Sequence, residues 1–298
     1  MRTTRIEAAG SKIRVIEDGA GDRSVLFVHG VGGWAENWTE IVERVAASGR
    51  RAIAFDLPGF GESSPVRRAR YFDPEAPFYA AVVDGVRRAL GLHRPHLVGH
   101  SLGTGVAFVS AVTDPDAFSS LVLVAPGGLG SDIAPFLRLW SLPGLDLVVR
   151  APRPRFIRRA VLRSCFADPS RIPDHLYVRL DRYDGTDPET MRVMRQIATL
   201  RGVRSDLRHA WIARAGRFTG PVLVVWGAAD NVIPASQARA LGSAFAEHEL
   251  AVIPDAGHLV MAEQPDAFAG ALLPFLDRVE RNDGGARTMA SGVAHQER

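Results

Sequence analysis

A pentapeptide near residue 100 constrains the fold of this chain more than any other segment. Residues 99–103 are Gly-His-Ser-Leu-Gly, which is the pattern G-x-S-x-G. The apolar run at 96–98 precedes the pattern and predicts a strand, and the small-residue run at 103–112 follows it and predicts a helix. In that context the pattern indicates a sharp strand-to-helix turn that exposes Ser101 at its tip.

Short apolar runs alternate with longer helical runs through most of the chain. The other predicted strands are 13–16, 25–28, 52–55, 121–124, 222–225 and 250–253, and the other predicted helices are 38–47, 78–90, 237–245 and 267–279. This alternation predicts an α/β fold with a mostly parallel, doubly wound sheet that helices cover on both faces. The chain has 298 residues, of which 46% are hydrophobic, and can bury the core that such a sheet needs.

The alternation stops between residues 127 and 218. Strand-like runs disappear there, proline and arginine become frequent, and the apolar residues fit short helices. We therefore predict a helical lid at 127–218, inserted in an α/β core made of residues 1–126 and 219–280. Residues 281–298 are polar and contain glycine, which predicts a mobile tail.

Two residues that follow predicted strands are suited to activate Ser101. A serine hydroxyl is a weak nucleophile that needs a base, and the base needs an orienting acid. Asp230 follows the strand at 222–225, and His258 follows the strand at 250–253. The order serine, aspartate, histidine is typical of doubly wound serine hydrolases, so we predict Ser101 as nucleophile, Asp230 as acid and His258 as base. Asp132 is the rival for the acid, because it follows the strand at 121–124.

A glycine-rich segment, His29-Gly-Val-Gly-Gly-Trp, follows the strand at 25–28. Glycines let backbone N–H groups approach a ligand closely, so we predict an oxyanion hole made by the N–H groups of Val31 and Leu102. The segment contains neither the P-loop pattern nor G-x-G-x-x-G, which argues against a phosphate site. The residues predicted to contact substrate are Gly30, Gly32, His100 and Trp140.

Composition limits the partners that we expect. The net charge is only +3 and no nucleic-acid-binding motif accompanies it, so we expect no nucleic-acid partner. The single cysteine, Cys165, allows no internal disulfide and is predicted to be a packing residue rather than a nucleophile. The sequence contains neither a signal-peptide core nor a membrane-spanning apolar run, which indicates a cytoplasmic protein. We expect neither a metal nor an organic cofactor, and leave monomer and homodimer open.

Five segments together resemble the α/β-hydrolase superfamily, in the branch of small bacterial serine esterases, haloperoxidase-like enzymes and meta-cleavage-product hydrolases. They are Phe27-Val-His-Gly-Val-Gly-Gly, Asp56-Leu-Pro-Gly-Phe-Gly-Glu-Ser, Gly99-His-Ser-Leu-Gly, Trp226-Gly-Ala-Ala-Asp and Ala256-Gly-His-Leu. The resemblance covers residues 25 to 265 apart from the lid. It implies that His258 takes a proton from Ser101, that Ser101 attacks a carbonyl, and that water hydrolyses the acyl-enzyme. It also implies that Asp56 shapes a loop.

The resemblance leaves the substrate open, with a small-molecule carboxylic ester or related acyl compound as the broadest expectation. Meta-cleavage-product hydrolases carry Asn before the nucleophile and Trp after the histidine, where this chain has His100 and Leu259, although Asn37 matches their pattern. Hydrolysis of a C–C bond in a vinylogous diketone, a lyase or cyclase reaction, and a ligand-binding receptor on the same fold are the alternatives. In the lid, apolar residues between 136 and 147 and arginines between 150 and 163 are candidates for contacting substrate, or for packing and solvation.

Overall fold

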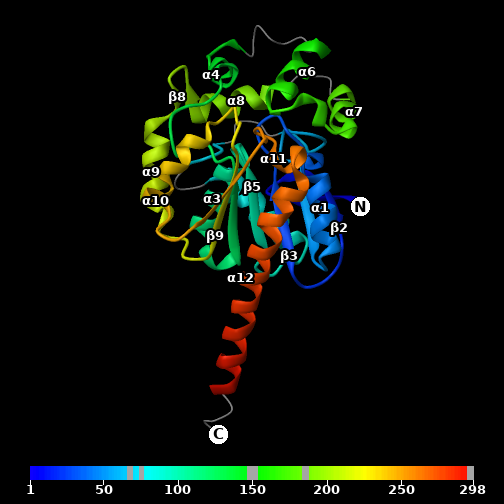
Figure 1. Cartoon of the computed structure of the whole chain (residues 1–298), viewed down its shortest axis with the longest axis vertical. Helices are drawn as coiled ribbons and strands as arrows, with labels where there is room; N and C mark the ends of the chain where they lie inside the picture. The colour runs from blue at the N-terminus through cyan, green and yellow to red at the C-terminus, as the bar shows by residue number, and fades with distance from the viewer. Residues whose placement is uncertain (66–69, 74–76, 146–153, 183–187, 294–298) are drawn as a thin grey trace.

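The computed structural model describes residues 1–65, 70–73, 77–145, 154–182 and 188–293, with residues 284–293 described by their backbone alone. An eight-stranded sheet forms its centre, in the order β1-β2-β4-β3-β5-β6-β9-β10 (Figure 1). The strands are β1 (Arg2–Ala8), β2 (Ser11–Asp18), β3 (Ser24–Val28), β4 (Arg51–Phe55), β5 (His96–His100), β6 (Ser120–Val124), β9 (Val222–Gly227) and β10 (Glu249–Ile253). The pairs β1–β2 and β2–β4 are antiparallel, and the strands from β4 to β10 pair in parallel. The predicted mostly parallel sheet is therefore confirmed.

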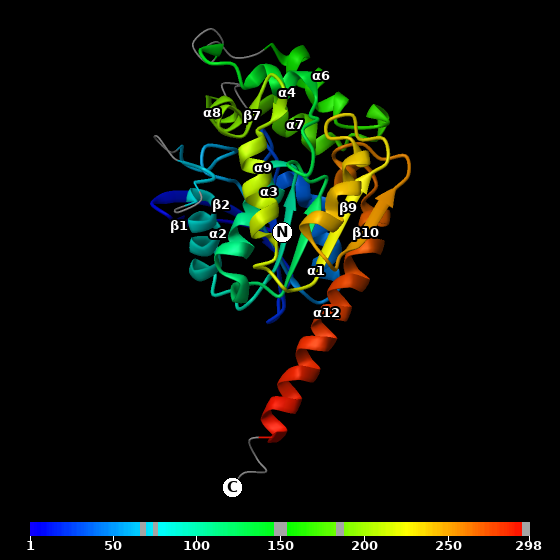
Figure 2. The ribbon, with the colours of Figure 1, turned by 90° about the vertical axis from the view of Figure 1, so that its left-hand side faces the viewer.

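Helices cover both faces of this sheet (Figure 2). One face carries α2 (Phe78–Ala89), α3 (Leu102–Thr113), α9 (Ser205–Ala215) and α10 (Leu241–Ala244), and the other carries α1 (Thr39–Ala47), α11 (Val260–Glu263) and α12 (Pro265–Val293). The two-residue period of a strand divides the core accordingly. Leu26 and Val28 of β3 point into the cluster beneath α2 and α3, whereas Val25 and Phe27 point into the cluster beneath α1 and α12.

The segment between β6 and β9 forms a cap above the carboxyl ends of the strands (Figure 1). Its helices are α4 (Pro135–Trp140), α6 (Arg155–Ser164), α7 (Asp174–Arg182) and α8 (Pro188–Ile197), and a small hairpin of β7 (Ala198–Thr199) and β8 (Gly202–Val203) follows. Helix α9 packs against α3 and α10 instead of lying over the strand ends. The predicted lid boundary at 218 stays a prediction, but these contacts group α9 with the core.

Several elements differ from the sequence-based prediction, among them β7 and β8, which form a hairpin in a segment predicted to be helical. Strand β1 was not expected, because most of its residues are polar. Its two apolar residues are Ile6, which is half-buried, and Ala8, which is buried. The helix predicted at 237–245 is a 3₁₀ helix, Ala235–Ala240, followed by the short α10. Helix α12 does not end at residue 279 but continues to Val293 and projects beyond the body (Figures 1 and 2). The mobile tail from Arg281 stays a prediction, and its last residues, 294–298, lie outside the described part of the chain.

Among the described residues, no helix combines the length and the apolar composition that crossing a bilayer would require.

Candidate active site

Ser101 occupies a strained turn between β5 and α3. Its φ of 52° lies in the left-handed region that L-residues rarely adopt, and the helix begins at the next residue. A Cβ atom on Gly99 would overlap the carbonyl oxygen of Gly103, and one on Gly103 would overlap that of Val28. Both positions therefore require glycine, which is the steric reason for the G-x-S-x-G pattern.

Asp230 and His258 form a buried hydrogen-bonded pair. Asp230 Oδ2 lies 2.8 Å from His258 Nδ1, and Asp230 Oδ1 accepts hydrogen bonds from the backbone N–H groups of Val232 (2.8 Å) and Ile233 (2.9 Å). Because a carboxylate only accepts, Nδ1 of His258 carries the proton and Nε2 is left as an acceptor. Asp132 lies elsewhere, with a side chain that is 71% exposed and 3.4 Å from Arg138. The structure thus brings the first candidate acid to the histidine and not its rival.

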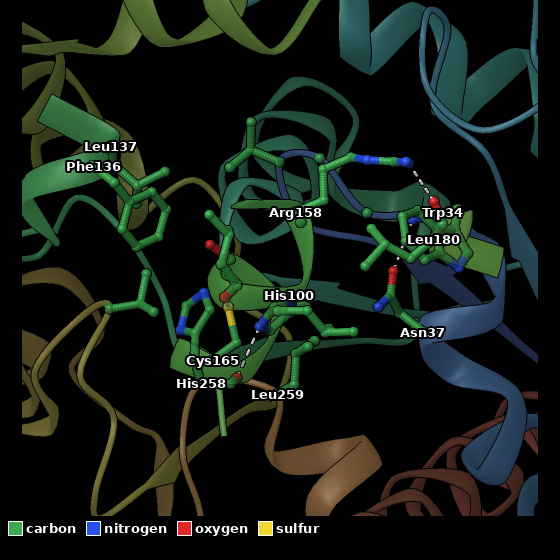
Figure 3. A pocket seen from close by; sticks show the side chains of 18 of the residues that line it. Trp34, Asn37, His100, Phe136, Leu137, Arg158, Cys165, Leu180, His258 and Leu259 are labelled. Atoms are coloured by element: carbon green, nitrogen blue, oxygen red, sulfur yellow. Dashed lines mark hydrogen bonds between the residues drawn. The ribbon is translucent and has the colours of Figure 1, made fainter. Parts of the chain in front are cut away.

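His100 supports the loop that carries His258. Its Nε2–H donates to the backbone carbonyl oxygen of His258 at 3.0 Å, and the two ring centroids lie 4.6 Å apart (Figure 3). Burial, together with the neighbouring His258, holds the pKa of His100 well below its ordinary value. His100 is therefore neutral, and it places no positive charge beside His258.

Cys165 lines a cavity together with Ser101 and His258 but is not activated (Figure 3). Burial, reinforced by the charge of Asp230, raises the pKa of the Cys165 thiol to about 12. Its Sγ–H points to the backbone oxygen of Val161 at 3.3 Å. A thiol in this state is a poor nucleophile, which agrees with the predicted packing role.

The two predicted oxyanion donors flank Ser101. Val31 follows β3, Leu102 follows β5, and these strands are parallel neighbours at the point where the order of strands reverses. Within the described residues, neither the Val31 nor the Leu102 N–H group donates a hydrogen bond to a protein acceptor. A Cβ on Gly30 would come within 3.1 Å of Ser101 Cβ, so the loop closes tightly on the nucleophile.

Two buried side chains hold that loop in place. His29 donates from Nδ1 to the Gly30 carbonyl oxygen (2.7 Å) and accepts at Nε2 from the Leu57 N–H (2.9 Å), and burial lowers the pKa of His29. Asp56 Oδ1 accepts from the Ala35 N–H at 2.7 Å. Both side chains are engaged with backbone groups, so Asp56 shapes the loop as the resemblance implies.

The cap and the core enclose a first cavity with about 700 Å³ of empty space, part of it open to solvent. Its walls include all four predicted substrate-contact residues, Gly30, Gly32, His100 and Trp140, as well as Ser101 and His258. Of the apolar cap residues, Phe136 and Leu137 also line it (Figure 3), whereas Leu139 is 49% exposed.

The cap arginines divide between this cavity and the surface. Arg158 lines the first cavity and donates to the Leu180 carbonyl oxygen at 2.5 Å (Figure 3). Arg155 and Arg159 pair with Asp181 instead. Leu147, Arg150 and Arg153, which fall in the predicted substrate-contact ranges, lie outside the described residues.

A second cavity, with about 460 Å³ of empty space, adjoins the other side of Ser101. It shares Val31, Ser101 and Leu137 with the first cavity, and it also includes Leu102. Apart from Ser101, its lining is apolar, and it includes Met194 and Ile197 of α8 and Trp211 of α9. These residues were missed from sequence, because only the fold brings them to Ser101.

Glu263 was also missed, although it anchors the loop of the candidate base. Its Oε2 accepts from the N–H groups of Gly257 (2.7 Å) and Ala167 (3.0 Å), and its Oε1 accepts from the N–H of Asp168 (2.7 Å). A Cβ on Gly257 would lie 2.7 Å from the nitrogen of Ala167, so the two segments are in close contact. Glu263 therefore ties the residue before His258 to the end of α6. We call residues 165–168 with Glu263 the anchor.

Over the described ranges, no group of three or more His, Cys, Asp or Glu side chains is placed to hold a metal ion. His29, His100 and His258 instead make the separate hydrogen bonds given above.

Comparison with known proteins places this geometry in a family. The family model described as alpha/beta hydrolase fold matches residues 23–265. The dihydrolipoyllysine-residue acetyltransferase component of the acetoin cleaving system of Pseudomonas putida is 33% identical over 91% of this chain and 68% of its own length. The chain thus spans about two thirds of that relative. A 2-hydroxy-6-oxononadienedioate/2-hydroxy-6-oxononatrienedioate hydrolase of Cupriavidus pinatubonensis is 26% identical over 89% of this chain and 90% of that protein.

Solved structures agree in fold. The meta-cleavage product hydrolase of Pseudomonas fluorescens IP01 superposes with a TM-score of 0.73 at 24% identity, covering 92% of this chain and 97% of that one. The 2-hydroxy-6-oxo-6-phenylhexa-2,4-dienoate hydrolase of Rhodococcus sp. strain RHA1 has the same TM-score at 23% identity, covering 93% and 100%. The match of the family model over most of the chain, with the sheet and helices described above, shows that this protein belongs to the α/β-hydrolase fold family.

Proposed function

We propose that this protein is a serine hydrolase that cleaves a small-molecule carboxylic ester or a related acyl compound through Ser101, His258 and Asp230. The observation that carries the proposal is the fixed acid–base pair. Two backbone N–H groups and His258 share the carboxylate of Asp230, so the His258 ring is held in the tautomer that accepts a proton at Nε2. Ser101 and His258 line the same cavity.

The proposed reaction has two steps. His258 takes the hydroxyl proton of Ser101, the oxygen attacks the ester carbonyl, and the N–H groups of Val31 and Leu102 stabilise the oxyanion. His258 then donates that proton to the departing alkoxide, which leaves as an alcohol. A water molecule, deprotonated by His258, then attacks the acyl-enzyme, and His258 returns this proton to the Ser101 oxygen as the bond breaks and a carboxylic acid is released.

The roles of these residues orient the substrate. The leaving group must lie beside His258, which lines the first cavity and not the second. The carbonyl oxygen must point to Val31 and Leu102, and Leu102 lines the second cavity alone. We therefore place the leaving group in the first cavity and the acyl group in the apolar second cavity.

A second candidate is hydrolysis of a C–C bond in a diketone acid. Asn37, the position that matches the meta-cleavage-product hydrolases, and Arg158 both line the first cavity, where a carboxylate would meet the guanidinium. Relatives named as hydrolases of this kind match most of the chain. His100 and Leu259 stand where that group has Asn and Trp, which favours the ester.

The test is hydrolysis of p-nitrophenyl esters from acetate to palmitate, with Ser101→Ala as the control. We expect turnover that peaks at one chain length and disappears in Ser101→Ala. A vinylogous diketone acid is assayed in parallel by the loss of its absorbance. Turnover of the diketone with no turnover of any ester would replace the first candidate with the second. Ester turnover that survives in Ser101→Ala would remove Ser101 as nucleophile.

A further inference from the structure

A third cavity, with about 370 Å³ of empty space, lies behind the second one and away from Ser101. It runs from Thr104 and Gly105 of α3 to Phe245, and its lining is almost wholly apolar. The described residues that line both the second and the third cavity are Gly105, Gly127 and Trp211. Since two of these are glycines, Trp211 supplies the shared side chain of the wall between them.

The indole of Trp211 is seated firmly in that wall. A Cβ on Gly105 would lie 2.8 Å from Cη2 of the ring, and a Cβ on Gly128 would overlap the same ring. The ring also meets Phe72 edge-on, with centroids 5.7 Å apart, and Phe108 at 6.1 Å. The ring thus packs closely against Gly105 and Gly128, which explains why neither position carries a side chain.

We propose that Trp211 is the specificity-determining residue for the length of the acyl chain. The proposal rests on the proposed function, in which the acyl group enters the second cavity. An aliphatic chain that grows from the Ser101 carbonyl fills the second cavity and then meets the indole. Chains longer than this space must fold back or push the ring aside, although an apolar cavity of similar size lies directly behind it.

The expected change of kcat/KM with acyl chain length follows from the burial of methylene groups. Each methylene that leaves water for an apolar cavity favours binding by a factor of about four. For the wild-type protein we expect kcat/KM to rise by about that factor per added methylene, and then to fall once the chain reaches Trp211. Removal of the indole joins the two cavities, so the rise should continue to longer chains.

The experiment compares wild type, Trp211→Ala, Trp211→Leu and the control Ile212→Ala. Ile212 is the next residue of α9 and lines the third cavity but not the second, so its truncation enlarges the same region and leaves the wall intact. Two readouts are taken for each protein: kcat/KM on p-nitrophenyl esters of increasing acyl length, and the rate of covalent labelling by alkyl fluorophosphonates of matching length. Trp211→Leu keeps an apolar side chain in the core if the alanine variant does not fold.

We expect both Trp211 variants to move the optimum to longer chains in both readouts, and Ile212→Ala to keep the wild-type optimum. An unchanged optimum in a folded Trp211 variant would overturn the proposal, as would an equal shift in Ile212→Ala. The labelling readout separates this proposal from the proposed function. If wild type hydrolyses no ester but its labelling optimum still moves in Trp211→Leu, the proposed function fails and the role of Trp211 stands.

Discussion

Replacement of Asp230 by asparagine tests the orientation of the base at the level of single atoms. The new side chain would keep its oxygen on the N–H groups of Val232 and Ile233, because an amide nitrogen cannot accept those two hydrogen bonds. Its NH₂ group would then face Nδ1 of His258, which lies 2.8 Å from the carboxylate in the wild-type protein. Nδ1 must become the acceptor, which moves the ring proton to Nε2, the nitrogen that should accept from Ser101.

We expect Asp230→Asn to lose most of its kcat and little of its stability. A histidine held in the wrong tautomer lowers kcat by about 10⁴, equivalent to about 5.5 kcal/mol of transition-state stabilisation. The two backbone hydrogen bonds survive and the side chain keeps its volume, so we expect the melting temperature of Asp230→Asn to stay within a few degrees of wild type.

The assay is kcat on the preferred p-nitrophenyl ester together with a thermal melt, and Asp132→Asn is the matched control. The control residue follows a neighbouring strand but is exposed and pairs with Arg138 instead of His258, so its variant should keep wild-type activity. Full activity in a folded Asp230→Asn protein would refute the assignment of the acid, and a large loss in Asp132→Asn would transfer the role to that residue.

Three further outcomes follow from the structure. Gly103→Ala should lose activity and at least about 1–3 kcal/mol of stability, because its Cβ meets the carbonyl oxygens of Val28 and His29, whereas Gly242→Ala, with open space around it, should be neutral in activity and melting temperature. Burial raises the pKa of Glu189 from 4.5 to about 7 despite its ion pair with Arg192. The folded protein therefore binds this proton more tightly than the unfolded chain does. The protonated Glu189 carboxyl stabilises the fold below pH 4.5, and this stabilisation is lost as the pH rises through 7. Between pH 4.5 and pH 8, the unfolding free energy of wild type should therefore fall by up to about 3 kcal/mol more than that of Glu189→Gln. Urea unfolding of both proteins at the two pH values measures this difference. With a pKa of about 12, Cys165 should resist iodoacetamide at pH 8 in the native protein and react once the protein is unfolded in urea, and rapid alkylation of the native state would contradict the raised pKa of its thiol.

Local sequence patterns were enough to predict those features of the protein that depend on residues close together in the chain. The turn at Ser101 needs glycine on both sides for steric reasons, so its sequence is recognisable without the structure. Asp230 and His258 were found because each follows a strand of a parallel sheet, and such strands end at one edge. Their catalytic roles stay a prediction until the variants are measured.

Other parts depend on contacts between distant segments and have no local pattern. Trp211 meets Gly105 and Gly128 only after α9 folds back onto α3, so the sequence showed merely an aromatic residue in a polar helix. Glu263 binds backbone N–H groups nearly one hundred residues away, and a backbone partner can have any side chain. Strand β1 was missed because an edge strand with one solvated face has little apolar content.

The anchor also limits how this protein can acquire a new substrate range. Exchanging cap segments between relatives is a natural route to a new cavity, since the cap supplies much of the lining. A graft that changes the backbone path of residues 165–168 displaces the N–H groups that Glu263 accepts from and releases the loop before His258, so it alters the base together with the pocket. A graft that ends before Cys165 and resumes after Asp168 changes the lining of the cavity and leaves the position of His258 unchanged. The hydrogen bonds of Glu263 therefore determine where a cap segment from a relative can be joined to this protein.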